Sequence, residues 1–152
     1  MAADIYPFLT FENSKEAMDY YVQEFGAEII ERTPFTAEQI QTLGLDTDNL
    51  ADTTALGQFE VAGHRILCGD ATMTMPQASS LVSLFLDFGG DVAAAKELFD
   101  HLASSDQQRV TLPFADHLVG RQLGQIVDKY GVTWYISSGE KCSVREAATA
   151  SN

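Results

Sequence analysis

The side chains best suited to chemistry in this 152-residue chain include an amide and a carboxylate that share one short segment. Gln58 and Glu60 are two residues apart, so in an extended strand both point to the same face. If that face is closed off from water, Glu60 is a weak candidate for the catalytic base of a metal-free enzyme. If it is open, Glu60 is an ordinary surface glutamate beside a hairpin. Gln125 recurs in a matching segment, where the two amides either bind a polar ligand or satisfy backbone groups of the sheet.

Three histidines and Cys68, one of the two cysteines, complete the set of candidate reactive groups. His117 follows Asp116 in a segment that we predict to be the loop before the seventh strand, where it would form the lip of a binding site. Adjacent residues of an extended chain point in opposite directions, which argues against an acid/base pair of these two. His64 and His101 are expected in a turn and near a helix end. Cys68 falls in a core strand, where cysteine behaves as a small apolar residue.

These residues are positioned by a structural unit that occurs twice. A strand leads directly into an amphipathic helix in both halves, and apolar residues match apolar residues along them. Asn13 with Glu16 predicts a capping box at the start of the first helix, and Gly26 predicts its end. Asp91 is the expected cap of the second helix. The aligned positions are Leu9 with Leu86, Phe11 with Phe88, and Ala17 with Ala94.

The second parts of the two halves match as well. Residues 56–58 and 123–125 are both Leu-Gly-Gln, and each triplet is followed by a strand, a glycine turn and another strand. One further strand, at 28–32 and at 108–114, precedes each hairpin. The order β-α-β-β-β therefore occurs twice, and we predict an α+β fold.

We expect one domain, residues 1–138, made of modules at about 4–70 and 81–137. Residues 139–152 are the expected flexible C-terminal tail. The first module carries an insertion, residues 33–54, with a short helix that Thr36 and Gln39 cap and Gly44 ends.

Composition restricts the partners. Nine Lys and Arg against 22 Asp and Glu give a formal charge of −13, which disfavours binding to nucleic acid or to an anionic membrane. No apolar run approaches the roughly 20 residues of a membrane span. Two cysteines imply no disulfide framework, and the N-terminus has no signal-peptide pattern, so we expect a cytoplasmic protein.

Several of these segments carry a family resemblance. Residues 6–11, 20–21, 25–26, 63–64 and above all 124–134 resemble PhnB-like proteins of the vicinal-oxygen-chelate superfamily, which includes glyoxalase I, bleomycin-resistance proteins and extradiol dioxygenases. The resemblance spans roughly residues 4–137. It implies a glyoxalase/bleomycin-resistance-type fold, in which curved mixed sheets surround a shared cavity, and a homodimer. Leu118, Val119 and Gln122 depart from the pattern, which elsewhere has an aromatic pair and an arginine there.

The resemblance also indicates where a metal would bind. Metalloenzymes of this superfamily place His and Glu ligands on the first and last strands of each module. Those positions fall here at 6–8, 67–68, 82–84 and 135–136, whose side chains do not hold a hard divalent ion. We therefore expect no metal site and no other cofactor.

The expected site is a cavity lined by aromatic rings with a few polar groups, which is typical of small-molecule pockets. Strand alternation directs Phe8 and Phe85 into it, joined by Trp134 or Tyr135. The hypothesis is a small-molecule-binding protein. The alternatives are an enzyme (metal-free, or a metal-dependent lyase, isomerase or dioxygenase) and an interaction module whose cavity is vestigial. The rings themselves either line a cavity or fill a solid core. The expected ligand-binding residues are Tyr6, Phe8, Gln58, Glu60, Phe85, His117, Gln125, Trp134 and Tyr135.

Overall fold

The computed structural model describes residues 1–139, and the chain divides after Gln77 into two compact units. Each unit contains one four-stranded mixed sheet and repeats the order β-α-β-β-β, so the predicted α+β fold class is confirmed. The predicted tail, residues 139–152, lies outside the described residues except for Gly139, which ends the last strand.

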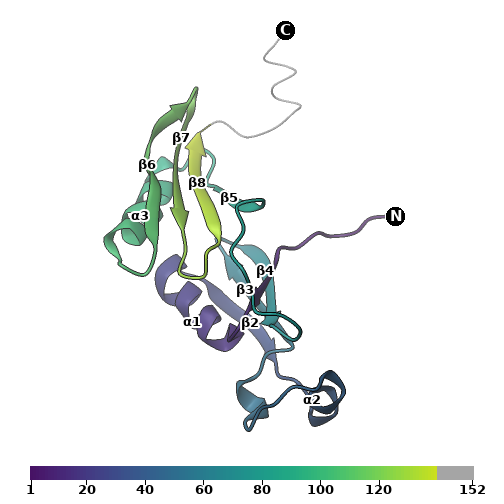
Figure 1. Ribbon diagram of the computed structural model, residues 1–152. Coiled ribbons are helices and arrows are strands. Elements are labelled where there is room, and N and C mark those ends of the chain that lie inside the picture. The colour runs from purple at the N-terminus through teal and green to yellow at the C-terminus, as the bar shows by residue number, and fades with distance from the viewer. Residues whose placement is uncertain (140–152) are drawn as a thin grey trace. The chain divides into compact units, whose positions relative to one another are not determined.

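The first unit is a sheet with one helix on one of its faces (Figure 1). The strand order is β1-β4-β3-β2, with β1 parallel to β4 and the other pairs antiparallel. The bounds are β1 Phe8–Phe11, α1 Ser14–Phe25, β2 Glu28–Thr33, α2 Ala37–Leu43, the 3-10 helix η1 Leu50–Asp52, β3 Leu56–Val61 and β4 His64–Asp70.

The second unit repeats this topology, with strand order β5-β8-β7-β6 and β5 parallel to β8. The predicted strands are present, and β6 is longer than the sequence predicts: it includes His117, for which the sequence pattern predicts a loop. β8 likewise continues through Ser138 to Gly139. The bounds are β5 Ser83–Asp87, α3 Val92–Ser104, β6 Arg109–Leu118, β7 Arg121–Val127 and β8 Thr133–Gly139.

The helices begin and end at the residues that the sequence indicates. The side chain of Asn13 accepts a hydrogen bond from the backbone of Glu16 at 3.1 Å, and Asp91 does the same for Ala94 at 3.0 Å. Gly26 closes α1 in the left-handed conformation, with φ 68°. These caps satisfy backbone groups that a helix end leaves without partners.

Two glycines let each helix pack closely on its own sheet. A Cβ atom at Gly57 would lie 2.7 Å from Cys68 Sγ and 2.8 Å from Met18 Sδ. A Cβ atom at Gly124 would lie 2.4 Å from Cε2 of Phe99. Gly57 and Gly124 are the central residues of the two Leu-Gly-Gln triplets. The repeated glycine is therefore a packing requirement of the module.

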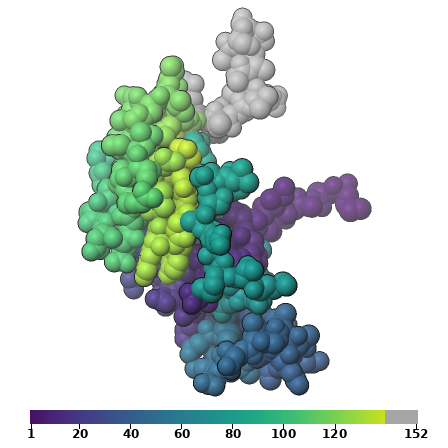
Figure 2. All heavy atoms as spheres, viewed as in Figure 1, coloured from purple at the N-terminus to yellow at the C-terminus, as the bar shows by residue number. Residues whose placement is uncertain are grey.

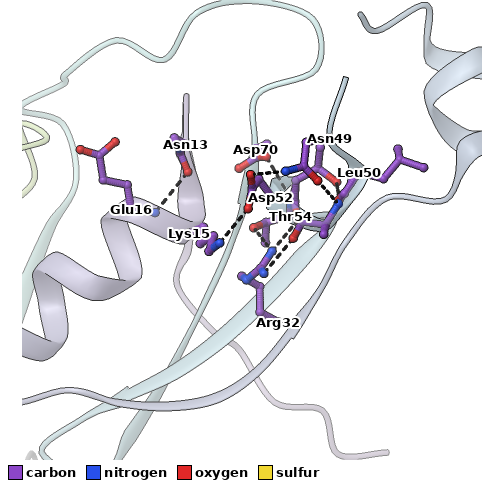
Figure 3. A network of polar contacts seen from close by, with 11 residues as sticks. Asn13, Lys15, Glu16, Arg32, Asn49, Leu50, Asp52, Thr54 and Asp70 are labelled. Carbon is purple, nitrogen blue, oxygen red and sulfur yellow. Dashed lines mark hydrogen bonds and ion pairs between the residues drawn. The ribbon is translucent and has the colours of Figure 1, made fainter. Parts of the chain in front are cut away.

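The insertion between β2 and β3 projects from the rest of the first unit, as the blue segment of Figure 2 shows. Its helix α2 has the predicted capping box of Thr36 and Gln39, yet α2 and η1 bury no residue. A polar network holds the base of the insertion (Figure 3). There the guanidinium of Arg32 donates to the backbone oxygens of Thr53 at 2.6 Å and Ala51 at 3.0 Å.

A carboxylate at the end of β4 joins the insertion to α1. Asp70 accepts from the backbone nitrogen of Ser14 at 2.8 Å, at the first turn of α1. Its second oxygen accepts from the backbone nitrogen of Thr54 at 2.9 Å. A single side chain thus fixes the start of a helix and the return of the insertion into the sheet.

Candidate functional site

The open face of the first sheet, defined as the face opposite α1, presents an aromatic ring and an amide in one row across three strands. Phe8 pairs with Leu67, and Leu67 pairs with Gln58, so these three side chains share a face. Phe8 is 53% exposed, whereas Phe59, on the α1 side, is fully buried. The predicted alternation along β1 is thereby confirmed. Tyr6 lies just before the strand and is also largely exposed.

A guanidinium binds two side chains at one end of this open face. Arg65 donates to Oε1 of Gln58 at 2.9 Å and to Oε1 of Glu60 at 3.3 Å. All three side chains are partly buried. Gln58 and Glu60 do lie on one face, as their spacing predicts, and the residue that sequence reasoning missed is Arg65. The short turn between β3 and β4 was the signal that could have indicated Arg65, because it places Arg65 opposite Glu60.

The open face of the second sheet, opposite α3, carries a matching row. Phe85 pairs with Tyr135, and Tyr135 pairs with Gln125. The two rings are stacked, with centroids 5.8 Å apart, and Phe85 is 49% exposed. Phe8 and Gln58 in the first unit thus correspond to Phe85 and Gln125 in the second. The duplicated sequence has produced the same arrangement of ring and amide twice.

A second arginine lies on the open face of the second sheet. Arg121 donates to Asp87 Oδ1 and to Ser137 Oγ, both at 2.9 Å, and its guanidinium carbon lies 6.0 Å from the centroid of the Phe85 ring. Only 11% of its side chain is exposed. The sequence pattern directed attention to the neighbouring Gln122, so the role of Arg121 was not predicted. Arg121 thus places a guanidinium, paired with the carboxylate of Asp87, next to the Phe85 ring.

Trp134 lies on the other face of β8 from Tyr135 and is 2% exposed. Its indole nitrogen donates to Oδ2 of Asp128 at 2.9 Å. Of the two residues expected to line a cavity, Tyr135 is on the open face and Trp134 is in the core beneath α3. The physical reason is the strict alternation of side chains along β8.

His117 lies on a groove of about 560 Å³ at the turn between β6 and β7. Its Nε2 is 2.7 Å from the backbone oxygen of Pro113, and no hydrogen bond joins it to Asp116 among the described residues. The groove contains no residue of the ring-and-amide row. Besides His117 and Asp116 it is lined by Val92, Leu118, Val119, Gly120, Arg121, Gln122, Ser138 and Gly139.

Cys68 is fully buried on the α1 side of β4. Burial raises the pKa of its thiol to about 11, so the sulfur is protonated at neutral pH. Within residues 1–139, no three His, Cys, Asp or Glu side chains are grouped so that they could hold a metal ion. No helix in that range combines the length and the apolar character that a bilayer span requires.

The duplicated module, with one four-stranded mixed sheet in each copy, is that of the glyoxalase/bleomycin-resistance-type fold. Residues 3–137 match the family described as 3-demethylubiquinone-9 3-methyltransferase, and the chain belongs to this family, whose solved members include PhnB-like proteins. No curated protein matches the sequence.

Solved structures share the fold at low identity. A protein from Bacillus cereus described as a putative 3-demethylubiquinone-9 3-methyltransferase, PhnB protein, is 21% identical, with a TM-score of 0.67 over 90% of this chain and 100% of its own. Protein PA1353 from Pseudomonas aeruginosa is 21% identical, with a TM-score of 0.68 over 92% and 100%. The fosfomycin resistance protein FosX from Listeria monocytogenes is 10% identical, with a TM-score of 0.62 over 99% of both chains.

Proposed function

We propose that this protein binds a small, partly aromatic or apolar molecule on its open sheet faces. The observation that supports the proposal is the repeated row: each sheet places an exposed phenylalanine and an amide on one face, two strands apart, Phe8 with Gln58 and Phe85 with Gln125. Large apolar side chains exposed together with a few polar groups are typical of ligand sites. Tyr6 and Tyr135 extend the aromatic surface of the two rows, and Glu60 adds a carboxylate.

A thermal-shift screen tests this proposal, because a ligand that binds only the native state raises the melting temperature. S-adenosylmethionine belongs in the screen, since the family description names a methyltransferase. Hits should lose their effect in Phe8→Ala or Phe85→Ala and keep it in Val22→Ala, which removes an exposed apolar side chain from α1 instead. A screen without hits, or hits that are indifferent to all three variants, would refute the proposal.

We propose further that binding does not use a resident metal. The positions that hold metal ligands in the superfamily's enzymes are here occupied at the open faces by Phe8, Leu67, Ser83 and Tyr135. None of these is a good ligand for a hard divalent cation. Metal analysis of the purified protein should find less than about one tenth of an equivalent of zinc, nickel, iron or manganese. A stoichiometric metal would instead support the metalloenzyme alternative, in line with FosX, one variant of which was solved with Mn(II) and 1S,2S-dihydroxypropylphosphonic acid.

Metal-free acid/base catalysis is the second candidate function, and the carboxylate of Glu60 on the open face favours it. A Glu60→Gln variant distinguishes the two functions. The amide oxygen introduced at position 60 can still accept from Arg65, so the affinity for a compound from the screen should change little, whereas any turnover of that compound should be abolished.

We infer a cytoplasmic homodimer from the family resemblance and the charge of −13. Light scattering at micromolar concentration should give twice the mass of 16.6 kDa. A monomer under these conditions would contradict the dimer without affecting the binding proposal.

A further inference from the structure

The hydrogen bond between Arg65 and Gln58 fixes which way the amide of Gln58 points. A guanidinium can only donate hydrogen bonds, so the amide oxygen must face Nη1 of Arg65, 2.9 Å away. The NH2 group of Gln58 therefore points away from Arg65. In the described part of the chain, no hydrogen-bond partner accepts from that NH2 group. Two donors are thus held in a fixed direction and left available.

Glu60 keeps Arg65 in the position that orients this amide. It accepts from the second guanidinium nitrogen at 3.3 Å, so the guanidinium is held on both sides, by a carboxylate and by an amide oxygen. The ion pair also compensates the charge of Arg65 on a face that is only partly exposed. The two side chains beside Gln58 thus act on its orientation.

The oriented donors lie at the border of the apolar part of the open face. Leu67 is the cross-strand neighbour of Gln58, and Phe8 is the next residue in the row. The Phe8 ring leans over Gly69, where a Cβ atom would come within 3.1 Å of it. A small molecule resting on Phe8 and Leu67 would present its polar end to the NH2 group of Gln58.

The second sheet provides a natural comparison. Gln125 occupies the matching place beside Tyr135, yet no guanidinium donates to its side chain among the described residues, since Arg121 donates to Asp87 and Ser137. Its amide can turn over and offer either a donor or an acceptor. The amide therefore has a fixed orientation in the first row and not in the second. The rows also differ at their middle position, which is Leu67 in the first and Tyr135 in the second.

We propose that Gln58 determines the specificity of the site by donating hydrogen bonds to an oxygen of the ligand, and that Arg65 is the positioning residue that holds the amide in its donating orientation. The ligand class is a small, partly aromatic molecule that carries a carbonyl or carboxylate oxygen. This inference rests on the proposed binding function and adds the chemistry of the polar contact.

Three compounds with the same apolar body test the inference on the full chain. Cinnamate and cinnamamide carry acceptor oxygens, whereas cinnamylamine carries only donors at neutral pH. Titration calorimetry should give at least about tenfold tighter binding for the first two than for the amine, the ratio that one charge-assisted or well-oriented hydrogen bond provides. Comparison of cinnamate with cinnamamide shows whether the preferred acceptor is a carboxylate or a carbonyl.

Matched variants then locate the effect. Gln58→Glu keeps the shape and the bond from Arg65 but removes both donors, so the affinity for neutral cinnamamide should fall at least about tenfold. Gln125→Glu makes the same change in the second row and should alter the affinity for cinnamamide by less than about threefold. In Arg65→Met the amide is free to turn over, and the side-chain NH2 signals of Gln58 in ¹⁵N-correlated spectra should shift and no longer respond to cinnamamide as they do in the wild type.

The outcomes separate this inference from the function on which it rests. If the general screen finds ligands but the amine binds as tightly as the two acceptors, or if Gln58→Glu and Gln125→Glu lose equal affinity, the assignment to Gln58 is wrong and the binding function stands. If the screen finds ligands and none of the three cinnamyl compounds binds, the ligand class is wrong. A screen with no hits at all refutes both.

Discussion

The indole nitrogen of Trp134 donates to Oδ2 of Asp128 at 2.9 Å, and this contact joins the two ends of the β7–β8 hairpin. The other oxygen of Asp128 accepts from the backbone nitrogens of Tyr130 at 2.9 Å and Val132 at 3.0 Å. One buried carboxylate therefore organises the whole turn. Residues 128–134, part of the segment 124–134 that most resembles the family, thus have a structural role: they build the hairpin, and Trp134 faces the core.

Replacement of Asp128 should destabilise the protein strongly. Asp128→Ala removes three hydrogen bonds and leaves buried donors without partners, so the free energy of unfolding should fall by about 2–4 kcal/mol. Asp128→Asn keeps one acceptor oxygen, so its free energy of unfolding should lie between those of the wild type and Asp128→Ala. Urea unfolding followed by the fluorescence of Trp134, the chain's single tryptophan, measures both. Equal stabilities for the two variants would show that the acceptor oxygen retained in Asp128→Asn contributes little.

The glycine at the centre of β7 permits the close approach of α3. Gly124→Ala places a methyl group 2.4 Å from the buried ring of Phe99, so we expect a loss of about 1–3 kcal/mol in unfolding free energy. Gly90→Ala is the matched control, because no atom lies within 4 Å of its added Cβ, and it should change stability by less than about 0.5 kcal/mol. Similar losses for both variants would indicate a backbone effect in place of a packing effect.

Elements with strong local signals could be predicted from the sequence. Asn13, Asp91 and Thr36 each cap a helix where the pattern placed a start, and the two Leu-Gly-Gln triplets occupy matching strands. These signals depend on neighbours within a few residues or on the internal repeat, so a single sequence contains them.

The polar contacts of the open faces could not be predicted in the same way. Arg65 bonds to Gln58 across a hairpin, and Arg121 bonds to Asp87, a residue from a different part of the chain. Such pairs depend on strand register, which alternation alone does not fix. For the same reason the sequence left open whether Trp134 or Tyr135 shares a face with Phe85, and it placed His117 in a loop although β6 extends past it.

Loss of the Arg32 hydrogen bonds at the base of the insertion should increase local opening of the insertion without lowering the stability of the whole protein. Arg32→Ala removes two hydrogen bonds to backbone oxygens, so amides of residues 37–52 should exchange their hydrogens at least about tenfold faster, while the unfolding free energy changes by less than about 1 kcal/mol. Lys15→Ala breaks only the exposed ion pair with Asp52, whose side chains are 46% and 53% exposed, and should leave both quantities nearly unchanged. Hydrogen exchange with mass spectrometry separates the two variants. Equal protection in Arg32→Ala and the wild type would show that the guanidinium does not hold the insertion.

The buried thiol of Cys68 predicts how stability changes at high pH. Burial raises the pKa of Cys68 from its ordinary 9.0 to about 11 in the folded state. Between these values the unfolded chain binds fewer protons than the folded chain, so this thiol lowers the free energy of unfolding as pH rises. Its stabilising contribution is complete below about pH 9 and is lost as pH approaches about 11.

A comparison with Cys68→Ala isolates this contribution from the tyrosines and lysines that titrate in the same range. Cys142→Ser serves as the common background, and urea unfolding is measured at several pH values from about 8 to about 10.5. The stability difference between the protein that retains Cys68 and the Cys68→Ala variant should shrink as pH rises. The folded protein should also fail to react with a thiol reagent at about pH 8 until it is unfolded, because a buried, protonated sulfur is a poor nucleophile. A stability difference that stays constant over this range, or rapid labelling of native Cys68, would mean that the thiol is accessible to water.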